Sequence, residues 1–137
     1  MFFGLWMLLM LGDSHQPFVL ITAERTPIEQ ISRWELRQIF LKKINKVRKV
    51  RLKPIQLRSG NPTRQVFEKY VHGSGFRLSQ YWELKRLQGG EKPPLEVAGE
   101  AHMLVYIERN PGFLGYVSPT RLPELKGLAL KVVILID

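Results

Sequence analysis

The sequence predicts an α/β fold in which a single mixed sheet is flanked by helices. Short apolar runs rich in β-branched residues alternate with segments of helical periodicity, and glycine or proline signals separate them. The chain has 137 residues, enough for one domain of ordinary size. Hydrophobic residues make up 45% of the chain and charged residues 24%, which is the balance of a globular protein rather than a disordered one.

Residues 1–16 are typical of a secretory signal peptide. Their apolar run, residues 1–11, is too short to span a bilayer, which takes about 20 residues. No lysine or arginine precedes the run and no Ala-x-Ala site follows it, so two alternatives stay open: a buried N-terminal helix or strand, and a leader clipped by a misplaced start codon. We expect an exported chain in which residues 17–137 form one domain.

The domain is expected to begin with a strand and a capped helix. Residues 18–23 read FVLITA, a β-rich apolar run typical of a buried strand. Ser32 is a natural N-cap, and Glu35 three residues later completes a capping box. The helix that follows is expected to continue to about Lys42.

A basic strand and a second helix come next. Residues 49–53 alternate apolar with basic side chains, the period-2 pattern of a strand with one wet face. Residues 55–57 are expected to form a further strand, which starts only after Pro54. Asn61 suits the N-cap of the next helix and Pro62 its first position.

Spacing assigns the buried face of this second helix and the elements after it. Four residues at helical spacing are expected to face the core: Val66, Phe67, Tyr70 and Val71. Gly73 and Gly75 supply the stop. The remaining expected elements are a helix over residues 78–87, a helix over 98–109 with Met103, Leu104 and Ile107 inward, a strand over 113–117, a turn or single helical turn over 122–127, and a last strand over 128–136.

The turn that leads into the second helix is the strongest candidate for a ligand site. A helix start presents free backbone N–H groups, and small residues let a ligand approach them. Arg64 in the first turn opposes the helix dipole by a few tenths of a kcal/mol, which a bound anion would offset. The sequence therefore predicts an anion site made of Arg58, Ser59, Gly60, Asn61, Thr63 and Arg64. An ordinary capped helix with a surface arginine is the alternative.

The charge of the chain favours anionic partners in general. Lysine and arginine number 21 against 12 acidic residues, a formal charge of +9. Residues 42–53 hold seven of these cations and no acid, which suits phosphates or an acidic protein. No aromatic residue is interleaved with these charges, so there is no stacking platform for single-stranded nucleic acid. A solvated strand face is the simpler interpretation.

Nothing in the sequence supports catalysis, a metal or a cofactor. The chain has no cysteine, and its three histidines, His15, His72 and His102, lack metal-ligand spacing. No serine lies in a G-x-S-x-G context. Glu96, Glu100 and Glu108 are interpreted as surface charge. We expect a protein that is not an enzyme.

Three segments, in order, resemble the periplasmic phosphate-binding proteins, the substrate-binding proteins of phosphate ABC transporters. Residues 32–41 (SRWELRQIFL) are similar to that family's helix ending in Ile-Phe-Leu-Gly-Lys, with Lys42 in place of its glycine. Residues 58–67 (RSGNPTRQVF) resemble its phosphate loop, of whose Ser-Gly-Thr only Thr63 is kept. Residues 110–117 (NPGFLGYV) resemble its Pro-Gly-Ala-Ile-Gly-Tyr-Val strand entry.

The resemblance covers about residues 18–133 and implies one lobe of a type 2 periplasmic-binding-protein-like fold. It implies phosphate or a similar oxyanion as ligand at the start of the second helix, a periplasmic location, and a membrane transporter or another envelope protein as partner. A single lobe is expected to bind the anion weakly. Two alternatives stay open: an envelope interaction module without a small ligand, and a basic nucleic-acid-binding protein.

Overall fold

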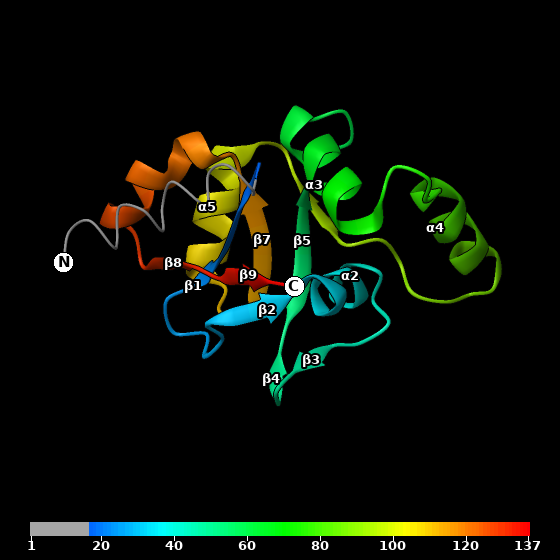
Figure 1. Cartoon of the computed structure of the whole chain (residues 1–137), viewed down its shortest axis with the longest axis horizontal. Coiled ribbons are helices and arrows are strands. Elements are labelled where there is room, and N and C mark those ends of the chain that lie inside the picture. Colours follow the sequence, from blue (N-terminus) through cyan, green and yellow to red (C-terminus); the bar gives the residue numbers. More distant parts are fainter. Residues whose placement is uncertain (1–16) are drawn as a thin grey trace.

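The core of the fold is a five-stranded mixed sheet (Figure 1). A computed structural model describes residues 17–137, so the predicted leader, residues 1–16, lies outside the described residues. The two pairings of β5 are parallel and the two pairings of β1 are antiparallel, which confirms the mixed sheet. In spatial order the strands are β6 (Leu95–Val97), β5 (Lys53–Leu57), β7 (Phe113–Val117), β1 (Val19–Ala23) and β8 (Leu130–Val132).

The single last strand expected over residues 128–136 is wrong. The chain forms two short strands there, β8 and β9 (Ile134–Ile136), which belong to different sheets. The change of partner occurs at buried Val133, whose N–H donates to the carbonyl of Leu20 at 2.9 Å. β9 then pairs in parallel with β2 (Gln30–Ser32), a strand too short for its pattern to be recognised.

The basic strand expected over residues 49–53 is also divided. β4 (Val50–Arg51) pairs with β3 (Lys46–Val47) in a small hairpin, while Lys53 already begins β5. The two hairpin-turn residues, Arg48 and Lys49, both have positive φ, as a two-residue turn of this kind requires. β5 includes Pro54, so this strand starts before the proline rather than after it.

Helices cover both faces of the sheet (Figure 1). Successive residues of a strand point to opposite faces, and β7 shows this directly. Gly115 faces the helix α5 (Glu100–Arg109), whereas the ring of Tyr116 stacks 3.9 Å from that of Phe67 in α3 (Pro62–His72). α2 (Arg33–Phe40) lies beside α3. No helix within residues 17–137 is long and apolar enough to cross a membrane.

Two further elements lie at the margins of the fold. α4 (Leu78–Leu87) buries no residue and stands away from the sheet in Figure 1, although the Tyr81 hydroxyl donates to the carbonyl of Leu41 at 2.8 Å. Between β7 and β8, where a turn or a single helical turn was expected over residues 122–127, the chain forms a longer 3₁₀ helix, η1 (Pro119–Gly127). The boundaries of α4 agree with the helix expected over residues 78–87.

The predicted buried face of α3 is only partly right. Phe67 and Val71 are buried as expected, but Val66 is 39% exposed and Tyr70 is half-buried. His72 completes the buried face instead, because the helix is rotated toward its Phe67 side, where Phe40 and Tyr116 pack. The inward residues predicted for α5 are all buried: Met103, Leu104 and Ile107.

The capping box that begins α2 is confirmed. The hydroxyl of Ser32 accepts the N–H of Glu35 at 3.0 Å, and the Glu35 carboxylate accepts the N–H of Ser32 at 2.9 Å. Partial burial alone would raise the pKa of Glu35, but the Ser32 N–H and the Arg48 guanidinium outweigh it and hold that pKa below its usual 4.5. The box therefore stays intact at neutral pH.

Ser32→Ala is expected to lower the free energy of unfolding by about 1 kcal/mol, because it leaves the N–H of Glu35 without its acceptor. Urea denaturation at pH 7 measures the loss. Ser79→Ala, at an exposed position within α4, is the matched control. A loss from Ser32→Ala no larger than that from Ser79→Ala would contradict the role of the cap.

Candidate functional site

The predicted anion loop lies between the end of β5 and the start of α3. Gly60 has φ of +89°, a conformation that favours glycine, and the N–H of Asn61 donates back to the carbonyl of Arg58 at 3.2 Å. Arg58, Ser59 and Gly60 are exposed. The Arg58 guanidinium forms no ion pair within residues 17–137, so its charge is free to meet a ligand.

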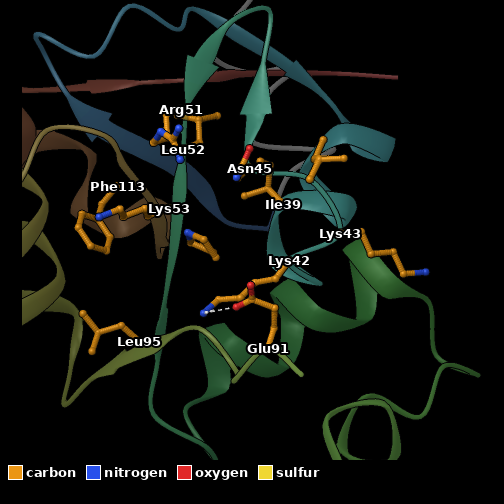
Figure 2. Close-up of a pocket in the computed structure, with 12 residues that line it drawn as sticks. Ile39, Lys42, Lys43, Asn45, Arg51, Leu52, Lys53, Glu91, Leu95 and Phe113 are labelled. Carbon is orange, nitrogen blue, oxygen red and sulfur yellow. Dashed lines mark ion pairs between the residues drawn. The ribbon is translucent and has the colours of Figure 1, made fainter. Parts of the chain in front are cut away.

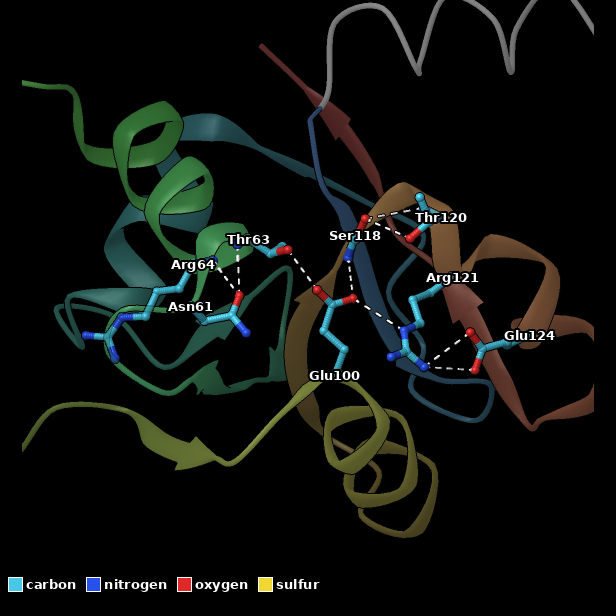
Figure 3. Close-up of polar contacts among 8 residues, drawn as sticks. All are labelled: Asn61, Thr63, Arg64, Glu100, Ser118, Thr120, Arg121 and Glu124. Atoms are coloured by element: carbon cyan, nitrogen blue, oxygen red, sulfur yellow. Dashed lines mark hydrogen bonds and ion pairs between the residues drawn. The ribbon is translucent and has the colours of Figure 1, made fainter.

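The backbone donors expected to be free at the start of α3 are already used. Asn61 Oδ1 accepts the N–H of Thr63 at 2.8 Å and that of Arg64 at 3.3 Å (Figure 3). Pro62 has no N–H, and the N–H of Gln65 donates to the Asn61 carbonyl within the helix. The N-cap side chain therefore already satisfies the N–H groups of Thr63 and Arg64, two of the donors on which the predicted anion site depends, and binding at this loop stays a prediction.

Arg64 does not present an unpaired charge either. Its guanidinium donates to Glu68 at 2.8 Å, to Glu96 at 2.9 Å and to the carbonyl of Leu57 at 3.0 Å. Its side chain is only 15% exposed. Burial by itself would lower the pKa of Arg64, but the Glu68 and Glu96 carboxylates outweigh it and raise that pKa. Arg64 therefore stays positively charged, and the two carboxylates balance its charge. Glu68 and Glu96 thus offset the unfavourable interaction between Arg64 and the helix dipole, a role that was predicted for a bound anion.

Thr63 takes part in a polar cluster that the sequence analysis did not foresee (Figure 3). Its hydroxyl donates to Glu100 Oε2 at 2.7 Å, and the N–H of Ser118 donates to Glu100 Oε1 at 2.9 Å. The Nε of Arg121 lies 3.6 Å from the same Oε1. We call the Thr63 hydroxyl, the Ser118 N–H and the Arg121 guanidinium the donor cluster.

The donor cluster and Glu100 come from three separate elements. Thr63 is the second residue of α3, Ser118 and Arg121 lie at the start of η1, and Glu100 is the first residue of α5. The interpretation of Glu100 as surface charge is wrong, because its side chain is only 13% exposed and has three partners. Local sequence holds no signal for this cluster, since its members lie far apart along the chain and only the packing of α5 and η1 brings them together.

The donors of the cluster are of the kinds that oxyanions accept from. A hydroxyl and a backbone N–H donate to the Glu100 carboxylate, and the Arg121 guanidinium forms an ion pair with it. Hydrogen bonds to a charged acceptor are stronger than neutral ones. Arg121 also pairs with Glu124, 3.1 Å away. No group of three side chains able to hold a metal ion comes together within residues 17–137.

Comparison with known proteins relates this fold to solved structures. No protein-family model matches the sequence, and no curated protein does either. PstS from Borrelia burgdorferi matches with a TM-score of 0.71 and 12% identity, over 88% of this chain and 47% of its own. The chain therefore has the fold of phosphate-binding proteins, and it corresponds to less than half of their length.

Two further structures agree with this assignment of the phosphate-binding-protein fold. A candidate phosphate ABC transporter substrate-binding protein from Clostridium perfringens, solved with bound phosphate, matches with a TM-score of 0.67 and 16% identity, over 87% of this chain and 44% of its own. An ABC-type phosphate transport receptor from Vibrio cholerae matches with a TM-score of 0.65 and 14% identity, over 88% and 47%. The chain thus spans about half the length of these proteins.

Proposed function

We propose that this chain is a non-catalytic binding lobe that holds phosphate or a similar oxyanion weakly at the donor cluster. The observation that carries the proposal is that Thr63, Ser118 and Arg121 already hold a carboxylate. A phosphate oxygen accepts hydrogen bonds from the same three kinds of donor. Arg58, with its free guanidinium in the exposed loop before α3, adds attraction for the anion. The likeness to structures of phosphate-binding proteins supports the same ligand class.

Glu100 makes the binding weak, because phosphate and the Glu100 carboxylate compete for the same donors. Two negative charges in contact repel each other, so the carboxylate has to move out before the anion enters. The measured affinity is reduced by the fraction of molecules in which the donors are vacant. We therefore expect the wild-type chain to bind phosphate far less tightly than its donor set allows.

Glu100→Ala is expected to strengthen phosphate binding by about tenfold or more, because it removes the internal competitor. Isothermal titration of the full chain with inorganic phosphate at pH 7 measures the change. Glu100→Gln, which keeps the size of the side chain without its charge, is expected to show a smaller gain. Circular dichroism of both variants confirms that they are folded before the titration.

Two controls make this titration decisive. Glu124→Ala removes the same charge beside Arg121 but leaves the Thr63 and Ser118 donors occupied, so it is expected to change the affinity about twofold or less. Thr63→Val in the Glu100→Ala chain is expected to abolish most of the gain. If folded Glu100→Ala gives no heat with phosphate or sulfate, the donor cluster is not an oxyanion site.

That last outcome would favour a second candidate, an envelope interaction module that binds no small ligand. The observation behind it is the occupied cluster itself, since Glu100, Ser118 and Arg121 together join α5 to η1 and serve the fold without any ligand. In that case neither the wild-type chain nor the Glu100→Ala variant is expected to bind oxyanions. Glu100→Ala is then expected to lose stability with no functional gain.

We propose further that the chain is exported and works beside a phosphate ABC transporter. The likeness to a phosphate ABC transporter substrate-binding protein and to an ABC-type phosphate transport receptor supports this setting. Residues 1–16, with their apolar run over residues 1–11, fit an export signal. Cell fractionation with mass spectrometry of the mature N-terminus tests it. An unprocessed chain found only in the cytoplasm would contradict export, and steeply salt-dependent nucleic-acid binding there would support the basic nucleic-acid-binding alternative.

A further inference from the structure

A cavity lies at the opposite end of β5 from the donor cluster. α3 follows the last residue of β5, Leu57, whereas this cavity of about 500 Å³ is lined by its first residues, Lys53 and Pro54. The C-terminal end of α2, the β3–β4 hairpin and the start of β7 close the other sides (Figure 2). The volume falls in the range that holds a small organic molecule.

The walls of this cavity are apolar and its rim is cationic. The exposed Leu95 and the half-buried Phe113 supply apolar surface, and Phe113 supplies an aromatic ring, whereas Ile39 and Leu52 are buried. The ammonium group of Lys53 lies 5.7 Å from the centre of that ring, which places charge and ring side by side.

The cations at the rim are poorly neutralised. Lys42, Lys43, Arg51 and Lys53 line the cavity, with Glu91 as its one acidic residue. Lys42 pairs with Glu91 only at 4.0 Å, and neither Arg51 nor Lys53 forms an ion pair within residues 17–137. Lys43 extends away from the cavity in Figure 2, so three cations remain for a ligand. A bound anion would therefore contact positive charges that no acidic side chain neutralises closely.

Lys42 ends α2 in a Schellman motif. It has φ of +58°, directly after the C-cap residue Leu41, a position that favours glycine. The N–H of Lys42 donates to the carbonyl of Ile39 at 3.0 Å, and the N–H of Lys43 donates to the carbonyl of Gln38 at 2.9 Å. A side chain in this left-handed conformation costs about 1 kcal/mol.

We infer that this cavity binds a small organic phosphate that carries a planar ring, the chemistry of a nucleotide. The ring packs against Phe113 and Leu95, while the phosphate group meets Lys42 and Lys53 at the rim. Inorganic phosphate alone would leave the apolar walls uncovered, and a neutral ring would leave the lysines unpaired. The ligand therefore needs both parts, and its site is separate from the donor cluster.

Titration of the full chain with three probes tests this inference: ADP, adenosine as the ring without phosphate, and inorganic phosphate without the ring. ADP is expected to bind about tenfold or more tightly than either of the others. Lys53→Met, which keeps the length of the side chain without its charge, is expected to weaken ADP binding severalfold. ADP binding no tighter than that of adenosine or phosphate would overturn the inference.

Lys42→Gly separates binding from folding. Glycine relieves the backbone strain, so the midpoint of thermal unfolding is expected to stay level or rise, while ADP binding weakens about fivefold or more. Lys49→Gly is the matched control, because Lys49 has φ of +72° and equal charge but does not line the cavity. Equal weakening in both variants, or none in Lys42→Gly, would overturn the inference.

Discussion

Gly115→Ala is expected to lower the free energy of unfolding by roughly 2 kcal/mol, since overpacked cores lose about 1–3 kcal/mol. A methyl group at this position of β7 would lie 2.7 Å from Ile107 Cδ1, 2.7 Å from Met103 Sδ and 2.9 Å from Ile55 Cγ2. All three side chains are fully buried, so they have no solvent to move into. Glycine lets α5 pack directly on the sheet here, and a side chain would force the two apart.

Urea denaturation of the variant at neutral pH measures this loss. Gly127→Ala is the matched control, because its new methyl group would meet no atom within 4 Å. That variant is expected to change stability by about 0.5 kcal/mol or less. Equal stability of the Gly115→Ala and wild-type chains would show that α5 does not approach the sheet as closely as described.

The stability of the wild-type chain is expected to fall by roughly 3 kcal/mol between pH 6.5 and pH 4, because of His72. The His72 side chain is 7% exposed, and its Nδ1 has no hydrogen-bond partner within residues 17–137. Burial, and secondarily the positive charge of Arg37, lower the pKa of His72 from 6.5 to about 4. Below pH 6.5 the unfolded chain therefore takes up a proton that the folded chain does not accept.

The stability that depends on His72 decreases as the pH falls. A histidine with an acidic partner has the opposite effect, because its contribution to stability grows as the pH falls. The charged groups near His72 include Glu68 and Lys69, which line the same shallow surface cavity. Glu35, whose pKa is lowered, adds a further loss only below about pH 4.5. The window between pH 6.5 and 4.5 therefore reports mainly on His72.

His72→Phe is the variant that tests this prediction. It removes the titrating group and the unpartnered nitrogen while keeping a ring against Phe76, whose centre lies 5.5 Å from that of His72. Chemical denaturation from pH 7 to pH 4 is expected to show a much flatter profile for the variant. His102→Phe, at an exposed position within α5, is the control. A wild-type profile as flat as that of His72→Phe would contradict the assignment.

Much of the secondary structure could be predicted because it depends on neighbours in sequence. The Ser32 and Glu35 box needs only residues three apart, and the inward face of α5 follows from helical spacing. The strand at residues 113–117 is bounded by its own turn signals. In contrast, β2 and β9 have only three residues each, and they exist because the two segments pair with each other.

For the candidate site, the sequence by itself determined where α3 begins and that Thr63 and two arginines flank this point. It could not determine which donors are free, since Asn61 serves equally as a cap that fills the helix start and as part of a loop that leaves it open. Only the tertiary structure brings Glu100 from α5 and Ser118 from η1 together with Thr63, and brings Glu96 to Arg64. The physical reason is that a hydrogen bond depends on distances of about 3 Å, which packing of remote segments sets, whereas a cap depends on the local backbone alone.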